Sequence, residues 1–593
     1  MTDTTTQPDA VAAAPEAHEA EVSDRRSPGE WLRSHSRAEV AVWVGLIVLA
    51  VVLRVWDLGS RPFHHDESQD AYFSYTFSQD FKSYSYNPLL HGPVRFYLTA
   101  LNYKLFGDSN FTARLAPVYM GTLLVGLPYL LRHQMGRVAA IAAGLILAIS
   151  PSVLYFSRFA REDIYLAAVS LGLFVACFRF VRKPRTLTLC LIGFLISFSF
   201  GVKESGLVTT FIVGGFFITA VGVQGILAQR RGGAFTDGEV LGAIAKVGWP
   251  AWVSSIAVLV FTYSFLFTRF FTGFTCTTTE YAGHPAHQTS CLDGVFYGLG
   301  YWQAQQKVAR GGDSAWLYPG IIFSNEWPVL LLAVVGVVFT FLRPSLLRFF
   351  ALWMFVCTLA FYMWGSERFA WLVLHPLVPL VLLAGIGLQS LWELRSRIAR
   401  GGAFAAVAIG AAYLIFASFE TNARDGAIPR SWVVSTQSSV QVKQVTDQIA
   451  GLIAKAKAEG QPQPGITIDS SSGATFPYAW YLRHDAPGYI DMTTQGFVPN
   501  TSILIMTQEG REALRPSLSA YSVRPFDFRV WWVKDYKKKF SFTAWKNWFA
   551  HRTPWNTTGG LKEFFATRTE LGTVPGKGTK SAIPEPKPAP KAR

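Results

Sequence analysis

The sequence predicts an α-helical polytopic membrane protein that carries a small α/β domain after its last membrane helix. Composition is the first reason, because half of the 593 residues are hydrophobic and only 16% are charged. Soluble proteins average about a quarter charged residues. The second reason is the length of the apolar runs, since a membrane helix needs about 20 mostly apolar residues. About eleven runs approach that length: 38–56, 112–131, 137–156, 162–181, 186–201, 205–228, 247–268, 327–342, 346–364, 370–391 and 402–419.

The turns between these runs alternate between a basic set and a mixed set. The basic residues of the first set are Arg25, Arg26, Arg33, Arg37, Arg132, Arg137, Arg182, Lys183, Arg185, Arg230, Arg231, Arg343, Arg348, Arg395, Arg397 and Arg400. Basic turns of membrane proteins are cytoplasmic. We therefore expect a multi-pass protein of the plasma membrane with a cytoplasmic N-terminus and an extracytoplasmic C-terminal domain. This placement accounts for the net charge of +15 without nucleic acid, since no separate basic domain with a base-stacking face is visible.

Four regions follow from composition. Residues 1–37 are rich in Ala, Glu, Thr and Pro and predict a disordered cytoplasmic tail, too long and too acidic for the start of a signal peptide. Residues 38–419 form the transmembrane domain. Residues 420–570 alternate helix-like and strand-like stretches, which predicts an extracytoplasmic α/β domain. The Lys/Pro-rich residues 571–593 predict a second disordered tail.

Two outer loops are long. Residues 57–111 contain two amphipathic stretches, 66–81 and 92–107, that predict helices lying on the outer surface of the membrane. Residues 269–326 form the second long loop, and loops of this length are functional lids or disordered segments.

The five cysteines contain no CxxC pair. Cys276 and Cys291 share the second long loop and could pair if it faces an oxidising compartment. Cys177, Cys190 and Cys357 fall inside apolar runs, where cysteine is a small core residue.

Acidic and basic residues occur together at the outer ends of four membrane runs. These clusters are His64–Glu67, Arg158 with Arg161, Glu162 and Asp163, Lys203 with Glu204, and Glu367 with Arg368. Ionisable groups at membrane depth are costly and usually face a cavity or one another. The clusters therefore predict one polar chamber at the outer leaflet, with snorkelling of each side chain to water as the alternative.

The position of this chamber restricts its chemistry. Nucleotide sugars and ATP are cytoplasmic, so a group-transfer enzyme here must take its activated donor from the membrane, as a polyprenyl-phosphate-linked sugar. Transfer needs a carboxylate base, for which Asp66 and Glu67 are candidates, and fixed cations for the departing phosphate. The candidate cations are Arg114, Arg158, Arg161, Lys203 and Arg368. His91 and His375 are single histidines, which are more often hydrogen-bonded structural residues than catalysts.

Asp66 has two alternative interpretations. Asp66 and Gln69 have the spacing of a capping box, so Asp66 could be the N-cap of an amphipathic helix. His64, His65 and Asp66 could also ligate a divalent metal ion. No second Asp/His cluster has firm ligand spacing, so no metal ligand is assigned.

Several motifs resemble the GT-C membrane glycosyltransferases, in particular glycosyltransferase family 39 and the aminoarabinose-transferase-like proteins. These motifs are "HHDES" (64–68), "HGPVRFYL" (91–98), "TARLAPVYMGTL" (112–123), "SPSVLYFSRFAREDIYL" (150–166), "GSERFAWLVLHPLVPLVLLAG" (365–385) and "FPYAWYLR" (476–483). The sequence is most similar to a subfamily of archaeal and bacterial glycosylation loci that is named for an association with flippase activity.

This resemblance implies roles for individual residues. Asp66 and Glu67 occupy the place of an essential acidic pair whose Asp is the general base. Arg114 occupies the place of an Arg that contacts the donor phosphate, and the acidic position after the third span falls on Glu162 or Asp163. The paired histidines and the lack of a β-trefoil domain between spans depart from the mannosyltransferase pattern, so sugar and acceptor do not carry over.

The sequence therefore predicts an inverting GT-C glycosyltransferase that moves a sugar from a polyprenyl-phosphate donor to an extracytoplasmic acceptor. Asp66 is its expected base, and Glu67 orients Asp66 or the acceptor. The expected substrate-binding residues are His64, His65, His91, Arg114, Arg158, Arg161, Glu162, Asp163, Lys203, Glu204, Glu367, Arg368 and His375. The main alternative is a non-catalytic protein that binds lipid-linked sugars and assists a flippase. A secondary transporter fits less well, because the spans show no inverted repeat and few mid-membrane polar residues.

Overall fold

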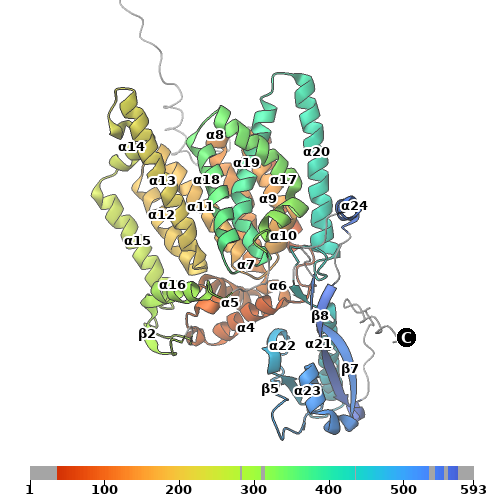
Figure 1. Ribbon diagram of the computed structural model, residues 1–593. Helices are drawn as coiled ribbons and strands as arrows, with labels where there is room; N and C mark the ends of the chain where they lie inside the picture. The colour runs from red at the N-terminus through yellow and green to blue at the C-terminus, as the bar shows by residue number, and fades with distance from the viewer. Residues whose placement is uncertain are drawn as a thin grey trace, which may run out of the picture.

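The computed structural model describes residues 37–280, 283–308, 314–434, 436–473, 475–532, 541–552 and 558–571. The two tails predicted to be disordered fall almost entirely outside these ranges. A bundle of apolar helices forms the larger part, and a domain built on a sheet lies at one end of it (Figure 1).

The predicted apolar runs are all helical. The helices are α3 (Arg37–Val55), α7 (Leu115–Gly126, continued by short helices to Met135), α9 (Arg137–Ile149), α11 (Asp163–Arg182), α12 (Thr186–Val202), α13 (Ser205–Arg230), α15 (Trp249–Phe267), α17 (Leu317–Leu342), α18 (Leu346–Trp364), α19 (Leu374–Trp392) and α20 (Arg397–Phe419). Within the described residues, nine helices are long and apolar enough to cross a membrane. The two shorter ones are α9 and α12, of 13 and 17 residues.

One predicted span is interrupted. The run 137–156 is not a continuous helix, because α9 ends at Ile149 and α10 (Pro151–Phe156) begins after Ser150. The Ser150 hydroxyl accepts a hydrogen bond from the backbone N–H of Val153 at 3.2 Å, which caps the new helix. Pro151 lacks an N–H and cannot continue α9, but it suits the first turn of α10.

The predicted outer loop 269–326 is partly helical. It contains a hairpin of β1 (Thr275–Thr277) and β2 (Gln288–Ser290), then α16 (Gly294–Gln305), and α17 already begins at Leu317. Within α17, Glu326 has non-helical angles of φ −119° and ψ 21°, and Pro328 follows two residues later. A proline at this distance explains the kink.

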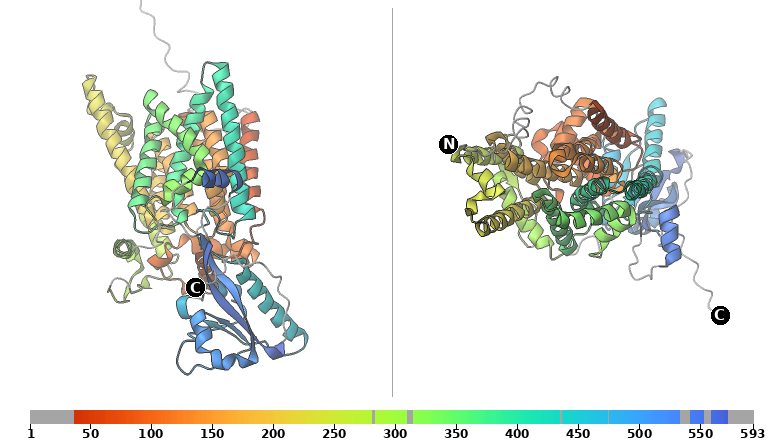
Figure 2. Two further views of the ribbon diagram at one scale, coloured as in Figure 1. Left: turned by 45° about the vertical axis from the view of Figure 1, so that its right-hand side comes forward. Right: turned by 90° about the horizontal axis from the view of Figure 1, so that it is seen from above.

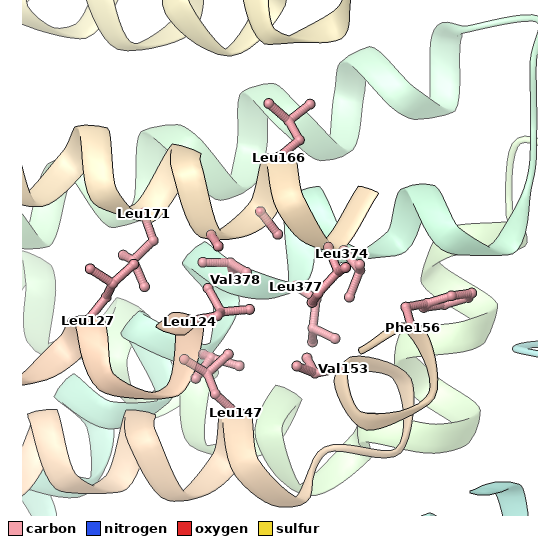
Figure 3. Close-up of a cluster of buried hydrophobic side chains, with 14 of the residues drawn as sticks. Leu124, Leu127, Leu147, Val153, Phe156, Leu166, Leu171, Leu374, Leu377 and Val378 are labelled. Carbon is pink, nitrogen blue, oxygen red and sulfur yellow. The ribbon is translucent and has the colours of Figure 1, made fainter. Parts of the chain in front are cut away.

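Helices α11 and α19 lie at the centre of the bundle, and almost all of their apolar residues are buried. Figure 3 shows part of this core, where Leu171 of α11 points toward Leu127, which lies just after α7. Two ionisable residues sit at the start of these central helices, Asp163 in α11 and His375 in α19, and this places them at one end of the core.

Helices α4 (His65–Gln79) and α5 (Val94–Phe106) confirm the two amphipathic helices predicted in the first outer loop. Together with α16 they lie across the end of the bundle that faces the sheet domain (Figure 1). Helices α8 (Arg132–Met135) and α14 (Glu239–Ala245), in or beside the basic turns, lie at the opposite end. The two sets of turns therefore occupy opposite ends of the molecule.

The C-terminal domain has a six-stranded sheet in the order β3-β7-β8-β6-β4-β5. The strands are β3 (Thr436–Ser438), β4 (Ile466–Asp469), β5 (Gly488–Ile490), β6 (Ile503–Met506), β7 (Tyr521–Trp532) and β8 (Thr558–Arg568). Strand β4 is parallel to β5 and β6, whereas β8 is antiparallel to β6 and β7. The apolar stripe of α21 (Val440–Ala458) packs on the sheet. Shorter helices α22 (Thr475–Tyr481) and α23 (Gln508–Ala513) complete the domain, which confirms the α/β fold predicted for it.

Helix α24 (Phe542–His551) lies between β7 and β8 in the chain but packs against the membrane bundle (Figure 2). The indole N–H of Trp548 donates to the carbonyl of Ser324 at 3.1 Å, and Arg552 donates to the Asn325 side chain at 2.6 Å. Both acceptors adjoin the kink in α17, so α24 attaches the C-terminal domain to that helix.

Cys276 and Cys291 are bonded as a disulfide in the β1–β2 hairpin. If this hairpin is extracytoplasmic, these cysteines in a Cys177→Ala/Cys190→Ala/Cys357→Ala background should react with a membrane-impermeant maleimide on intact cells only after reduction. Labelling of intact cells without a reductant would contradict the disulfide, and labelling only after the cells are permeabilised would contradict the orientation expected from the basic turns.

Candidate active site

Helix α4 begins with a cap made by His64. The Nδ1 of His64 accepts a hydrogen bond from the backbone N–H of Asp66 at 3.0 Å, and the Glu67 carboxylate accepts one from the His64 N–H at 3.1 Å. Burial lowers the pKa of His64 to about 4, so the ring is neutral and can accept. The predicted capping box of Asp66 and Gln69 is therefore wrong, and the Asp66 side chain is left for another role.

Glu67 is fully buried and paired with Arg114, which is also fully buried. The two carboxylate oxygens lie 2.8 and 2.9 Å from Nε and Nη2 of Arg114, and the backbone N–H of Ala160 donates to Oε1 at 2.9 Å. Arg114 Nη1 also donates to the carbonyls of Leu58 and Arg61, both at 2.9 Å. This pair fixes the end of the loop after α3 to the first turn of α4.

Asp66 is the exposed member of the acidic pair, because 24% of its side chain is accessible and Glu67 has none. Its Oδ2 lies 3.2 Å from Nη1 of Arg161. Burial raises the pKa of Asp66, but the positive charge of Arg161 outweighs that effect and holds the pKa at about 2. Asp66 is thus an ionised carboxylate that solvent can reach.

Glu162 is the centre of a buried ion-pair network that Arg161 connects to Asp66. Its Oε1 lies 3.1 Å from Arg161 Nη2, 3.1 Å from Lys203 Nζ and 3.2 Å from His91 Nε2. Its Oε2 contacts Nη1 of Arg95. Since Arg161 also contacts Asp66, the network is continuous with the exposed carboxylate.

The network extends along α11 and α19. Asp163 Oδ1 lies 2.8 Å from Lys203 Nζ and 3.3 Å from Nε2 of His375. The His375 ring stacks on Tyr362 of α18, with centroids 4.8 Å apart. Both acidic residues left open by the sequence, Glu162 and Asp163, therefore contact the same lysine.

His91 closes the network on its other side. Its Nδ1 lies 2.7 Å from Glu204 Oε2, and the ring stacks on Trp302 of α16 at 5.1 Å. The Tyr86 hydroxyl donates to Glu204 Oε1 at 2.6 Å. The second long outer loop thus contributes an aromatic wall to the site through Trp302.

Four of the predicted site residues lie at the margin of this network or apart from it. Arg158 donates to the carbonyl of Leu53 at 2.9 Å and so holds the end of α3. Glu367 and Arg368 are half-buried in the turn after α18. His65 lies against the C-terminal domain, where its Nδ1 is 2.7 Å from Nη2 of Arg529.

Arg95 and Asp70 are site residues that the sequence analysis missed. Arg95 Nη1 lies 2.6 Å from Asp70 Oδ2, and both line a small cavity with room for about one water molecule. Asp70 follows Asp66 by four residues, the spacing of one helical face, and Arg95 falls inside the motif "HGPVRFYL". Helical spacing within 66–81 was the signal that could have identified Asp70.

No group of three or more His, Cys, Asp or Glu side chains in the described ranges could hold a metal ion. His64 and His65 point in different directions, because one caps α4 and the other contacts Arg529. The residues considered as ligands with Asp66 therefore do not form a metal site here, and no step of the chemistry below uses one.

Comparison with known proteins connects this geometry to a class. Residues 90–232 match the family described as dolichyl-phosphate-mannose-protein mannosyltransferase. The structure is similar to ArnT from Cupriavidus metallidurans bound to undecaprenyl phosphate, with a TM-score of 0.51, 15% identity and coverage of 90% of this chain and 99% of that one. For apo ArnT the TM-score is 0.53 at 14% identity, with coverage of 90% and 100%. The apo oligosaccharyltransferase of Archaeoglobus fulgidus gives a TM-score of 0.49 at 12% identity, over 82% of this chain and 69% of that one. No curated protein sequence matches the chain.

The helical bundle, its polar network and the domain at the same end define an integral membrane protein with an enclosed ionic site at one end. More specifically, the chain has the fold of the GT-C superfamily, which confirms the fold that the sequence motifs predicted.

Proposed function

We propose that this protein is an integral-membrane glycosyltransferase that moves a sugar from a polyprenyl-phosphate donor to an extracytoplasmic acceptor, with inversion. The observation that carries the proposal is Asp66, a solvent-accessible ionised carboxylate beside Arg161 at the outer end of the bundle. The mannosyltransferase-family match and the fold shared with undecaprenyl-phosphate-bound ArnT support a lipid-phosphate donor. The placement of the basic turns at the opposite end supports a cytoplasmic N-terminal side and a plasma-membrane location.

In the proposed reaction, the acceptor oxygen attacks the anomeric carbon of the sugar while Asp66 accepts the proton of the attacking hydroxyl. The bond between that carbon and the phosphate oxygen breaks, and its electron pair stays on the lipid phosphate. Arg161 stabilises that phosphate, because its guanidinium can bind phosphate oxygens in a bidentate manner. When the phosphate replaces Asp66 as the partner of Arg161, the Asp66 carboxylate loses its ion pair and becomes a stronger base.

The remaining predicted residues take positioning roles in this proposal. Arg114 is bonded to Glu67 and to backbone carbonyls, and Arg158 to the end of α3, so neither is assigned to the donor phosphate. Lys203 holds Glu162 and Asp163, and thereby the orientation of Arg161. His91, His375 and Glu204 hold this network together, and Glu367 and Arg368 are placed at its rim.

The test is reconstitution of the protein in vesicles with a polyprenyl-phosphate sugar and an acceptor extract. Release of polyprenyl phosphate, with inverted configuration at the anomeric carbon of the product, supports transfer. Donor binding without release from any acceptor extract contradicts it and favours the alternative of a non-catalytic protein that assists a flippase.

Arg161→Gln should change the pH dependence of transfer. Arg161 lowers the pKa of Asp66 and burial raises it, so removing Arg161 raises that pKa, by about 1–3 units. Transfer falls as pH drops through the pKa of the base, so the acid limb of kcat/KM should move to higher pH by a similar amount. Arg430→Gln, which removes the ion pair of a half-exposed arginine with Asp425 at 3.5 Å, is the control. An acid limb that is the same in both variants would remove Asp66 as the base.

A further inference from the structure

The C-terminal domain is bonded directly to the segment that precedes Asp66. The backbone N–H of Phe63 donates to the Tyr481 hydroxyl at 2.8 Å, and the Gln437 side chain donates to the carbonyl of Pro62 at 3.1 Å. Tyr481 belongs to α22, and Gln437 to β3. The domain therefore forms one side of the space around the start of α4.

Arg529 of β7 extends from this domain to the residue next to Asp66. Its Nη2 lies 2.7 Å from Nδ1 of His65 and donates to the carbonyl of Gly473 at 3.2 Å. A guanidinium can only donate, so His65 Nδ1 is the acceptor and its ring is neutral. Burial and the charge of Arg529 both lower the pKa of His65, which agrees with this assignment.

Arg529 lacks a charge partner among the described residues. None of their carboxylates lies within ion-pair distance of it, and its buried Nε has no hydrogen bond to any of them. Glu563 on the adjacent strand and Asp66 act on it from farther away, but burial raises the pKa of Glu563 to about 8, so that this group is largely neutral at pH 7. A partly buried cation without a carboxylate in contact is unfavourable, and an anionic ligand would relieve that cost.

Most of the other cations around α4 already have carboxylate partners. Arg114 is bonded to Glu67, Lys203 to Glu162 and Asp163, and Arg95 contacts both Asp70 and Glu162. Arg161 is shared between Asp66 and Glu162. The charges of Arg529 and Arg161 both lower the pKa of His65, so both cations lie within electrostatic range of its ring.

We propose that Arg529 is a phosphate-binding residue of the active site, held in place by His65, so that the C-terminal domain supplies one cation and the membrane bundle supplies the other. The inference rests on the proposed function for the identity of the anion, a lipid phosphate. It adds a residue from beyond the membrane region and gives His65 a role as the acceptor that orients Arg529.

The test compares wild type with Arg529→Met and Arg529→Lys in the full-length protein in lipid nanodiscs. The probes are radiolabelled undecaprenyl phosphate and undecaprenol, which share the tail and differ in the phosphate. Arg524→Met is the matched control, because Arg524 is an exposed arginine on the same strand. We expect Arg529→Met to weaken undecaprenyl phosphate binding by about tenfold or more, the effect of losing hydrogen bonds to a charged group. Undecaprenol binding should stay within twofold, and Arg529→Lys should lose less than Arg529→Met, since it keeps the charge but not the planar fork.

Two results would overturn the inference: equal undecaprenyl phosphate affinity in Arg529→Met and Arg524→Met, or equal losses for both probes. The second would show that Arg529 only holds the domain in place. A double-mutant cycle tests the part played by His65, because His65→Ala added to Arg529→Met should weaken phosphate binding no further. Additive losses contradict that role. These binding results are independent of turnover, so wild type that binds but transfers no sugar would contradict the proposed function and leave the assignment of Arg529 to the phosphate intact.

Discussion

Asp66→Asn is expected to slow sugar transfer by about 10²–10⁴-fold while the donor still binds. The amide has the same shape as the carboxylate but cannot accept the proton of the attacking hydroxyl, and general-base catalysis contributes a factor of this size. The rate of polyprenyl phosphate release measures transfer, and binding of undecaprenyl phosphate measures the donor site. Asp66 is partly exposed and makes one ion pair with Arg161, so the variant should fold.

Asp57→Asn is the matched control for this variant. Asp57 lies in the same loop as Asp66 and is exposed, and its carboxylate accepts a hydrogen bond from the Ser60 hydroxyl at 2.7 Å. It should transfer sugar at the rate of wild type. An Asp66→Asn variant that does the same would remove Asp66 from the reaction, and the non-catalytic alternative would then explain the site better.

Glu67→Ala is expected to have its largest effect on stability. It leaves the buried guanidinium of Arg114 without its carboxylate, and breaking a buried ion pair costs about 3–5 kcal/mol. The midpoint of thermal unfolding in detergent should fall sharply. The double variant Glu67→Ala/Arg114→Met should recover part of the loss, because no unpaired charge remains.

The exposed pair of Lys443 and Asp447 is the control for Glu67. Its oxygen and nitrogen are 2.9 Å apart, but 63% of the Asp447 side chain is accessible, so Asp447→Ala should cost about 1 kcal/mol or less. If Glu67→Ala were no less stable than Asp447→Ala, the interpretation of Glu67 as a structural residue would be wrong. Glu67 would then not be distinguished from Asp66 by a structural role.

Much of the fold follows from the sequence, because apolar runs and basic turns are local features. Each predicted run is helical, and the alternation of helix-like and strand-like stretches predicted for 420–570 is present as α21, β4, α22, β6 and β7. The break at Ser150 was not predicted, although Pro151 marks it, because a proline in the first turn of a new helix and a proline that kinks one helix look alike in a hydropathy pattern.

The site could be predicted only in part. Clustering of charges at the outer ends of the spans identified Glu162, Asp163 and Lys203 as neighbours, and these residues contact one another. The sequence could not show that Glu67 is the buried partner of Arg114 and that Asp66 stays accessible. This difference depends on which carboxylate faces Arg114 once the loop has folded. The contact of His65 with Arg529 joins residues 464 positions apart, and no local pattern indicates it.

The order of strands in the C-terminal domain has a consequence for biosynthesis. Strand β8 lies between β7 and β6 and pairs with both, yet it is the last strand of the described chain. Until residues 558–568 have been translated, β6 and β7 each present an open edge, which is prone to pairing with other chains. During that interval α24, which precedes β8 in the chain, can already pack on the bundle. The incomplete domain would then be attached to the membrane part before its sheet contains β8. Termination of translation within 553–557 would leave the helical bundle complete and the sheet of the C-terminal domain without the strand that joins its two halves.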